Sequence, residues 1–280
     1  MLILALALAV ALPTLKSGGT VTLGPGPYDM IVLRGERFNP PVTINAGKTV
    51  VNGLRIWDSH GIIWRGGIIK APGGRDGHGP PVYGADIRRS DGLTFDGTTF
   101  TEALRGAVVA DSRNITVRNV HFTGLRSDGI NLAGNNNVLI ENNRFDDFTP
   151  VKPTGTKAGG DWKDGDHPDA IQLWNTPTTH SGTNIVIRGN VIDGDTQGIN
   201  FFGKRYDGYS RVTIEDNDLR ITYPAAISVF QCDQCSVRNN KVASVPGSKF
   251  RANVRFEDTK GALCGNTMTA IPSHAAAKRC

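Results

Sequence analysis

The chain has 280 residues, of which 39% are hydrophobic, 20% are charged and 34 are glycine. This composition supports a folded core and excludes wholesale disorder, and the lack of repeated long apolar runs excludes a polytopic membrane protein. The formal net charge of +5 and the isoelectric point near 9.1 favour an anionic partner, such as an acidic glycan, a nucleic acid or an anionic surface.

The chain begins with an uninterrupted apolar run over residues 2–12. The triplet at residues 9–11 is Ala-Val-Ala, a small-x-small pattern typical of a cleavage site, so residues 1–11 are predicted to be a signal peptide. The run is too short to span a bilayer, although no Lys or Arg precedes it. A buried N-terminal strand and a misassigned start are the alternatives. We therefore expect a secreted or periplasmic protein whose mature part, residues 12–280, has no membrane segment.

A nine-residue pattern recurs along the chain. The clearest copies occupy residues 114–122, 137–145, 184–192, 211–219 and 234–242, and weaker copies begin at Gly61, Gly92 and Lys260. Within each copy, apolar and polar residues alternate with period two, which predicts a β-strand. The seventh position is often Asn, as in Asn143, Asn190 and Asn217.

A second short strand lies upstream in each unit. Its copies occupy residues 128–132, 169–173, 197–201, 225–229 and 252–256. Units of this length cannot bury an apolar face alone, so they must stack, which would align the central Ile residues in one interior column and the recurring Asn in a ladder. We predict an all-β protein, a single-stranded right-handed parallel β-helix of about eight or nine coils. A β-propeller is the competing fold, but its blades need about 40 residues each.

One interval in the repeat is much longer than the others. Asn143 and Asn190 are 47 residues apart, which marks an inserted loop at residues 149–167. Insertions in a solenoid form loops on one face, which is often the binding face. The end of this loop is rich in Asp, and Asp164 and Asp166 are predicted as oxygen ligands of a metal, with Ca²⁺ as the expected ion. The alternative is a solvated polar loop.

The strand after the insertion starts with a carboxylate. If the coils stack in register, Asp169 lies beside Asp128 on the preceding coil and Gln197 on the next one. The two carboxylates would be about 5 Å apart at the backbone, where like charges repel and one pKa rises. Such a pair serves as a general acid with a base, or holds Ca²⁺; capping of the strand entry is the alternative. His167, at the same strand entry, is a candidate general base.

Residues at odd offsets from the central Ile point out of the solenoid. The amides of Gln172 and Asn200 are therefore predicted to donate hydrogen bonds to substrate oxygens. Trp174, Phe202 and Phe230 would form an outward aromatic ladder, either as a platform for sugar rings or as a small core covered by the insertion.

The four cysteines lie in the last fifth of the chain, at Cys232, Cys235, Cys264 and Cys280. An even number in an exported protein permits two disulfides in any of three connectivities. Residues 232–235 have the spacing of a redox motif but lack a βαβ context, so a structural role is expected for all four.

The repeats, together with the opening segment LKSGGTVTLGPGPY at residues 15–28, resemble the pectate-lyase-like right-handed β-helix superfamily. The resemblance covers nearly all of the mature chain. It is specific for the fold and not for the reaction, because this fold hosts lyases, hydrolases, epimerases, esterases and non-catalytic adhesins.

The strand entries are also similar to those of polygalacturonase-type hydrolases in this superfamily, which carry Asp-Gly-Ile, Asp-Asp-x-Ile and His-Gly-Ile on neighbouring coils. Residues 128–130 match the first motif. The chain departs from the second, where Pro168 precedes Asp169, and from the third, where Gln197 replaces His.

In lyases of this superfamily, a Lys or Arg abstracts the C5 proton and cations bind the uronate carboxylates. By this resemblance Lys204 joins Asp128, Asp169 and His167 as a catalytic candidate. The predicted substrate-binding residues are Arg126, Lys163, Gln172, Trp174, Gln197, Asn200, Phe202 and Arg205.

The primary hypothesis is a secreted polysaccharide lyase that cleaves an acidic, uronate-containing polysaccharide by β-elimination. An inverting glycoside hydrolase that uses Asp128 and Asp169 and a non-catalytic glycan-binding or adhesion β-helix are the alternatives. The sequence has no P-loop, Gly-x-Ser-x-Gly or His-Glu-x-x-His motif, and its basic residues are scattered. We expect no nucleic-acid partner, no membrane partner after signal cleavage, and a monomer.

Overall fold

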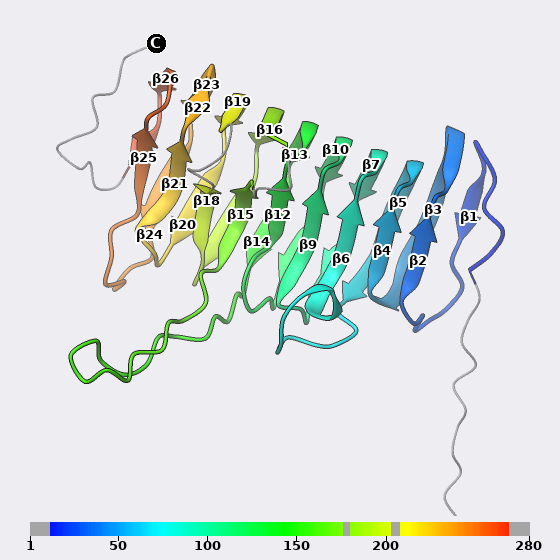
Figure 1. The fold of residues 1–280 in the computed structure, drawn as a ribbon, viewed down its shortest axis with the longest axis horizontal. Coiled ribbons are helices and arrows are strands. Elements are labelled where there is room, and N and C mark those ends of the chain that lie inside the picture. The colour runs from blue at the N-terminus through cyan, green and yellow to red at the C-terminus, as the bar shows by residue number, and fades with distance from the viewer. Residues whose placement is uncertain (1–11, 176–179, 203–207, 269–280) are drawn as a thin grey trace, which may run out of the picture.

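The computed structural model describes residues 12–175, 180–202 and 208–268, and its strands stack along the horizontal axis of Figure 1. One sheet has nine parallel strands in the described chain. They are β2 (Ile31–Arg34), β4 (Leu54–Trp57), β6 (Tyr83–Arg88), β9 (Arg105–Ala110), β12 (Ile130–Ala133), β15 (Asp169–Trp174), β18 (Gln197–Phe202), β21 (Ala225–Phe230) and β25 (Asn253–Glu257).

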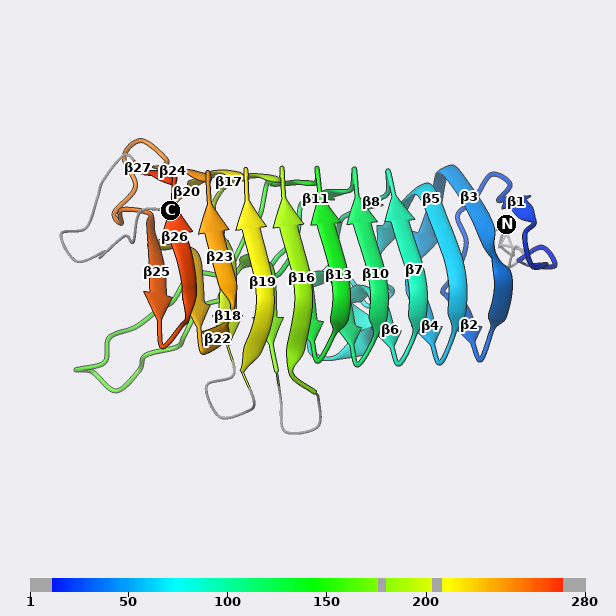
Figure 2. The same ribbon diagram turned by 90° about the horizontal axis from the view of Figure 1, so that it is seen from above.

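The second sheet contains two stacks, which Figure 2 shows from above. The first stack holds β1 (Thr20–Thr22), β3 (Arg37–Asn52), β5 (His60–Lys70), β7 (Asp91–Asp96), β10 (Arg113–Arg118), β13 (Asn136–Glu141), β16 (Gly182–Arg188), β19 (Tyr209–Glu215), β22 (Cys232–Asp233), β23 (Cys235–Arg238) and β26 (Gly261–Cys264). The other stack holds β8 (Thr99–Phe100), β11 (His121–Thr123), β14 (Arg144–Asp146), β17 (Val191–Gly194), β20 (Asp218–Ile221), β24 (Lys241–Ser244) and β27 (Thr267–Met268), and the long strands β3 and β5 extend into it.

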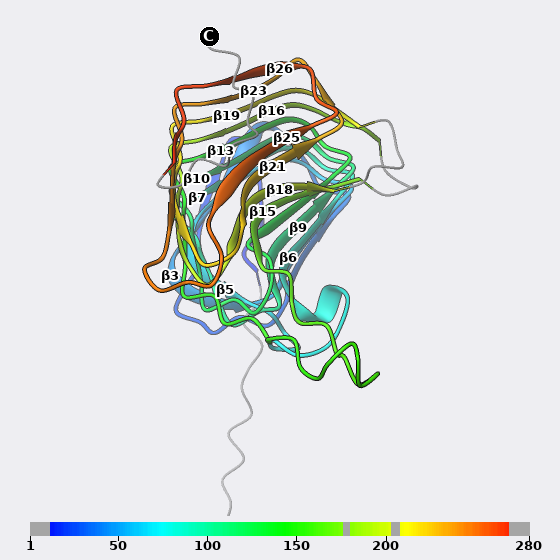
Figure 3. The same cartoon turned by 90° about the vertical axis from the view of Figure 1, so that its left-hand side faces the viewer.

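All named strand pairs are parallel, and each strand pairs with its equivalent one coil away. The view along the axis in Figure 3 shows the coils superimposed around one interior. The predicted all-β parallel solenoid is therefore confirmed, with about ten turns in the described residues instead of eight or nine.

The interior consists of apolar columns, one residue per coil. Ile130, Ile171, Ile199 and Ile227 have no exposed surface, as the repeat predicted. Aromatic rings form another column, in which Phe122 stacks on the equivalent Phe of the next coil, with centroids 4.7 Å apart and ring planes 3° apart. Each coil covers its apolar columns by stacking on its neighbours, so stability depends on the stack.

The recurring Asn residues form the predicted ladder at a turn. Nδ2 of Asn143 donates to Oδ1 of Asn190 at 2.9 Å, and the same bond links Asn190 to Asn217 and Asn217 to Asn240. The side-chain oxygen also accepts the backbone N–H of the preceding ladder residue, as Asn190 does from Asn143 at 3.0 Å. The ladder satisfies buried backbone groups where the chain leaves the sheet.

Two longer connections lie along one edge of the nine-stranded sheet (Figures 1 and 3). The first is the η1 loop, residues 71–82, which ends in the short 3₁₀ helix η1 (Pro80–Val82). The second is the predicted insertion at residues 149–167, here called the arm, in which Thr154 and Lys163 pair through their backbones.

The structure contains a disulfide between Cys232 and Cys235. Cys280 and the predicted signal peptide lie outside the described residues. Across the ranges that are described, no helix is long and apolar enough to span a bilayer.

Candidate functional site

The predicted carboxylates enter successive strands of the nine-stranded sheet. β12 and β15 pair Ile130 with Ile171, which sets Asp128 opposite Asp169. β15 and β18 pair Asp169 with Gln197. The three strand entries therefore lie on consecutive coils, in the predicted register.

A break in strand alternation turns the carboxylates outward. Nδ2 of Asn131 donates to Oδ2 of Asp128 at 3.2 Å, so side chains three positions apart meet on the outer side. Between them, Gly129 and Ile130 both face the core: Ile130 is fully buried, and a Cβ at Gly129 would lie 2.7 Å from Cδ1 of Phe145. A Cβ at residue 129 would also lie 2.5 Å from the backbone oxygen of Ala170, so glycine fits this close contact between coils.

Asp128 and Asp169 are nevertheless shielded from water, with exposed fractions of 1% and 0%. Burial raises the pKa of Asp169 well above its ordinary value, and the neighbouring charge of Asp128 raises it further. Burial also raises the pKa of Asp128, and Arg105 opposes this through an ion pair of 2.9 Å. In this conformation neither carboxyl group reaches a ligand on the surface.

The amides predicted to bind substrate are bound to these carboxylates instead. Nε2 of Gln172 donates to Oδ2 of Asp169 at 2.8 Å, and Nδ2 of Asn200 donates to Oδ1 of Asp169 at 2.6 Å. Asn131 donates to Oε1 of Gln172 as well as to Asp128. The result is one polar network across three coils, directly beneath the outer face.

Arg126, another predicted substrate-binding residue, joins the arm to the η1 loop. Its guanidinium binds Asp166 of the arm with two hydrogen bonds, of 2.8 and 3.1 Å, and Asp76 of the η1 loop with one of 2.9 Å. Asp166, predicted as a metal ligand, also accepts the backbone N–H of Val151 at 2.7 Å. These contacts use the charges of Arg126 and Asp166 to hold the base of the arm.

His167 and Lys163 are not brought to the carboxylate pair. The imidazole of His167 is mostly exposed and lies 3.5 Å from Asp164, while only its backbone oxygen contacts Asp169. Lys163 is exposed on the arm. Among the described residues, no three His, Cys, Asp or Glu side chains are grouped to hold a metal. The calcium site at Asp164 and Asp166 stays a prediction.

The remaining predicted residues lie on or after β15 and β18. Trp174 and Phe202 are paired across the two strands and are 44% and 37% exposed. Both rings therefore face outward, whereas Phe230, the third member of the predicted ladder, is partly buried against the core. Their use as a platform for sugar rings stays a prediction. Gln197 is half-buried. Lys204 and Arg205 lie outside the described residues.

In the nine-stranded sheet, the last residues of neighbouring strands point outward, and these side chains form a column with one residue per coil, here called the outward column. Small residues at two positions of this column create a hollow. On β6, β9, β12 and β15 this column reads Arg88, Ala110, Ala133 and Trp174. Between the two large residues, the alanines leave a cavity of about 460 Å³, here called the face hollow. Its lining also includes Tyr83, Arg89, Arg105, Val108, Asp111 and Asn131. This volume is within the range of small-molecule sites.

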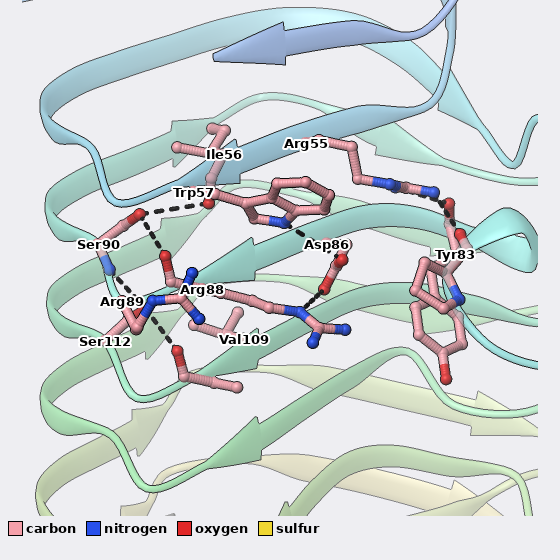
Figure 4. A network of polar contacts seen from close by, with 12 residues as sticks. Arg55, Ile56, Trp57, Tyr83, Asp86, Arg88, Arg89, Ser90, Val109 and Ser112 are labelled. Atoms are coloured by element: carbon pink, nitrogen blue, oxygen red, sulfur yellow. Dashed lines mark hydrogen bonds and ion pairs between the residues drawn. The ribbon is translucent and has the colours of Figure 1, made fainter. Parts of the chain in front are cut away.

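Buried or neighbouring carboxylates position the arginines of the face hollow. Nε of Arg88 donates to the fully buried Asp86 at 2.9 Å, and Asp86 also accepts Nε1 of Trp57 at 3.2 Å (Figure 4). Arg89 binds Asp58 at 2.7 Å. A guanidinium has five N–H donors, so these bonds fix each group and leave donors for an anion.

Sequence reasoning missed Tyr83, Arg88, Arg89, Arg105 and Asp111. A signal for them existed, because residues 83–88 and 105–110 have the same register as the stronger repeats. An alignment of these two segments with the stronger repeats would have shown the small outward residues between Arg88 and Trp174.

Comparison with known proteins agrees with this architecture. A family model described as "Right handed beta helix region" matches residues 76–242. The chain belongs to this right-handed β-helix family. The predicted superfamily is therefore confirmed in its broad form.

The proteins that resemble this β-helix have names that refer to different roles. Plasmin and fibronectin-binding protein A of Streptococcus pneumoniae (strain ATCC BAA-255 / R6) is 25% identical over 138 residues, which cover 46% of this chain and 19% of that protein. The solved structure of ORF18 of Geobacillus virus E2 has a TM-score of 0.50 and 10% identity, covering 89% of this chain and 46% of that one. The Dettilon tailspike protein has a TM-score of 0.47 and 12% identity, with 91% and 59% covered. The chain thus spans about a fifth of the curated relative and about half of the first solved structure.

Proposed function

We propose that this β-helix binds an acidic, uronate-containing polysaccharide along the outer face of the nine-stranded sheet, with one segment of the sugar chain in the face hollow. The observation that carries the proposal is the hollow itself. Arg88, Arg89 and Arg105 line a floor of small side chains that ends at the exposed ring of Trp174.

The chemistry of this lining fits a sugar acid. A uronate presents a carboxylate and several hydroxyls, and guanidinium groups bind carboxylates through paired N–H donors. The ring of Trp174 offers a flat apolar surface for one face of a sugar ring. The net charge of +5 adds long-range attraction for a polyanion, which salt screens.

Binding assays with alginate, polygalacturonate, gellan and hyaluronan test the proposal. We expect at least one to bind by calorimetry, more weakly at high salt. Trp174→Ala should weaken this binding about tenfold, the equivalent of about 1.4 kcal/mol. Trp162→Ala is the matched control, because Trp162 is a similarly exposed tryptophan on the arm. If no acidic glycan binds, or if both variants bind like the wild type, the proposal is wrong.

Fibronectin and plasmin serve as comparison ligands in the same assay, since the curated relative is named for binding them. Binding to either protein that Trp174→Ala leaves unchanged would place that activity outside the face hollow. A secreted or periplasmic location and a monomeric state are parts of the proposal.

The second candidate is cleavage of the bound polysaccharide by β-elimination. It is favoured by Arg105 and Tyr83, whose guanidinium and ring lie 5.6 Å apart in the lining of the face hollow. β-Elimination needs a positive group at the uronate carboxylate, a base that takes the C5 proton, and an acid that protonates the glycosidic oxygen as its bond to C4 breaks. Arg105 would serve as the positive group, and the phenol of Tyr83 is a candidate for the acid that protonates the leaving oxygen. Lys204 remains the candidate base of the sequence prediction.

A hydrolase that uses Asp128 and Asp169 has less support, because its two carboxyl groups would have to flank the scissile bond. Product analysis separates the candidates: a lyase generates ultraviolet-absorbing unsaturated uronates, a hydrolase generates only reducing ends, and a binding protein generates neither. We expect Tyr83→Phe to abolish any ultraviolet-absorbing product and to retain binding. Parallel assays with a chelator test the predicted calcium dependence.

A further inference from the structure

A second hollow lies around the corner from the face hollow, where strands of the nine-stranded sheet turn into the next sheet. This corner hollow has a volume of about 560 Å³ and lies over the starts of β3, β7 and β10. Arg89 and Asp111 line both hollows, so the two hollows adjoin at these residues. The corner hollow therefore lies outside the outer face of the nine-stranded sheet, where the proposed function places the glycan.

The floor of the corner hollow is buried and hydrogen-bonded within the fold. Ser90 and Ser112 are at most 3% exposed, and the backbone N–H of Ser90 donates to Oγ of Ser112 at 3.1 Å. Oγ of Ser90 also donates to the backbone oxygens of Arg88 and Ile56 (Figure 4). A ligand would therefore meet a preformed surface and would not have to order it.

Two polar side chains in this lining have no direct protein partner. The guanidinium of Arg37 is exposed and makes no hydrogen bond or ion pair with another described side chain, although its charge acts on Asp58. Oδ1 of Asp111 has no hydrogen-bond partner in the described part of the chain. The other cations are partly engaged, Arg113 with Asp91 at 3.0 Å and Arg89 with Asp58.

Arg37 and Asp111 line the same hollow but lie three coils apart in the strand register, or about 14 Å along the stack. A ligand that uses both needs an anionic group and hydroxyl donors spread over more than one sugar ring. A chain of sugar acids has both: a carboxylate of one unit would accept from Arg37, and a hydroxyl of another unit would donate to Asp111. A plain inorganic anion would meet only the first need and would be repelled by Asp111 and Asp91.

We propose that the corner hollow is a second saccharide subsite, which binds a further acidic sugar unit of the chain held in the face hollow, with Arg37 as its specificity-determining cation. The inference rests on the proposed function and deepens it: the complete site is bent, runs across Arg89 and Asp111, and selects for chains long enough to occupy both hollows.

The test compares oligosaccharides of increasing length, from disaccharides to octasaccharides, prepared from whichever of alginate, polygalacturonate or hyaluronan binds. Arg37→Ala should weaken the octasaccharide about tenfold or more, as expected for loss of a charge-assisted hydrogen bond, and leave the disaccharide unchanged. Arg37→Lys should restore part of the loss. Arg65→Ala on β5 is the matched control, because it removes an exposed arginine that lines neither hollow.

The outcomes separate this inference from the proposed function. If Trp174→Ala weakens all lengths while Arg37→Ala equals the wild type on the octasaccharide, the corner subsite is wrong and glycan binding at the face stands. If Arg37→Ala and Arg65→Ala weaken octasaccharide binding equally, the cause is the loss of one positive charge anywhere on the protein, and the proposed corner subsite is again wrong. If Trp174→Ala has no effect at any length, the proposed function itself fails.

Discussion

The backbone N–H of Asp169 donates a hydrogen bond of 3.0 Å to Oδ1 of Asp128, one coil earlier. This bond and the ion pair with Arg105 both favour the charged form of Asp128. Burial and then the charge of Asp128 oppose the ionisation of Asp169, while the hydrogen bonds from Gln172 and Asn200 and the charge of Arg105 favour it less strongly. The pKa of Asp169 is therefore raised well above its ordinary value.

This pair predicts a stability that declines as pH rises. The pKa of folded Asp169 is raised well above the ordinary value of 3.8, so the folded protein keeps a proton that the unfolded chain releases. The resulting stabilisation is complete below about pH 4 and is lost as the pH rises through the raised pKa. Asp169→Asn removes the charge, and we expect it to increase the free energy of unfolding at pH 8 by about 1–2 kcal/mol.

Urea unfolding of the wild type and of Asp169→Asn from about pH 4 to pH 9 measures this pH-dependent difference in the free energy of unfolding. Surface carboxylates such as Asp193, whose pKa is lowered mainly by its hydrogen bond to Arg220, act with the opposite sign and below about pH 4. These carboxylates are present in the wild type and in the variant, so their contributions cancel in the difference between the two free energies of unfolding. A variant that is less stable at pH 8, with an unchanged pH slope, would contradict the assignment.

The Asn ladder predicts a large cost for one truncation. Asn190 is fully buried, accepts two hydrogen bonds from Asn143, and donates to Asn217 and to the backbone oxygen of Ile140. Asn190→Ala leaves several buried groups without partners, so we expect a loss of about 3–5 kcal/mol in urea unfolding. Asn136→Ala, at an exposed position, is the control and should cost less than about 1 kcal/mol. Equal losses would rule out a special role of the ladder.

Arg126 predicts the behaviour of the arm. Arg126→Ala removes the bonds to Asp166 and Asp76, so the arm should open more often while the solenoid stays folded. Trypsin should then cleave at Lys157 or Lys163 about tenfold faster, with little change in urea midpoint. Arg188→Ala, which breaks an exposed ion pair with Glu141 elsewhere on the solenoid, should leave arm cleavage unchanged. An arm equally resistant in both variants would show that Arg126 does not restrain it.

The face hollow exists because Ala110 and Ala133 are small, so a large side chain at one of these positions should block glycan binding. Equivalent positions on later coils already hold the large side chains of Trp174 and Phe202, so β12 should accept Ala133→Phe without unfolding. We expect this variant to keep its thermal midpoint within a few degrees and to lose glycan binding about a hundredfold by calorimetry. Thr116→Phe, on the outer side of β10, is the control. Undiminished binding by Ala133→Phe would exclude the face hollow.

The sequence was sufficient to predict the solenoid and the register of Asp128, Asp169 and Gln197. This succeeded because a parallel stack repeats one pattern per coil, so spacing in sequence translates directly into position in space. The Asn ladder was predictable for the same reason.

Burial of the carboxylates and the contacts of Arg126 could not be predicted in this way. Arg126 meets Asp76 and Asp166, which are 50 and 40 residues away in loops that do not follow the repeat. The face hollow was missed for another reason: it depends on two small residues, Ala110 and Ala133, and a repeat search weights the conspicuous side chains.

The most direct test of the account is a crystal structure of the protein soaked with the tightest-binding acidic oligosaccharide. The account predicts sugar density on the outer face of β9, β12 and β15, with a ring against Trp174 and a carboxylate within hydrogen-bond distance of Arg88, Arg89 or Arg105. Density on another face of the solenoid, or on the arm alone, with the face hollow empty, would contradict it.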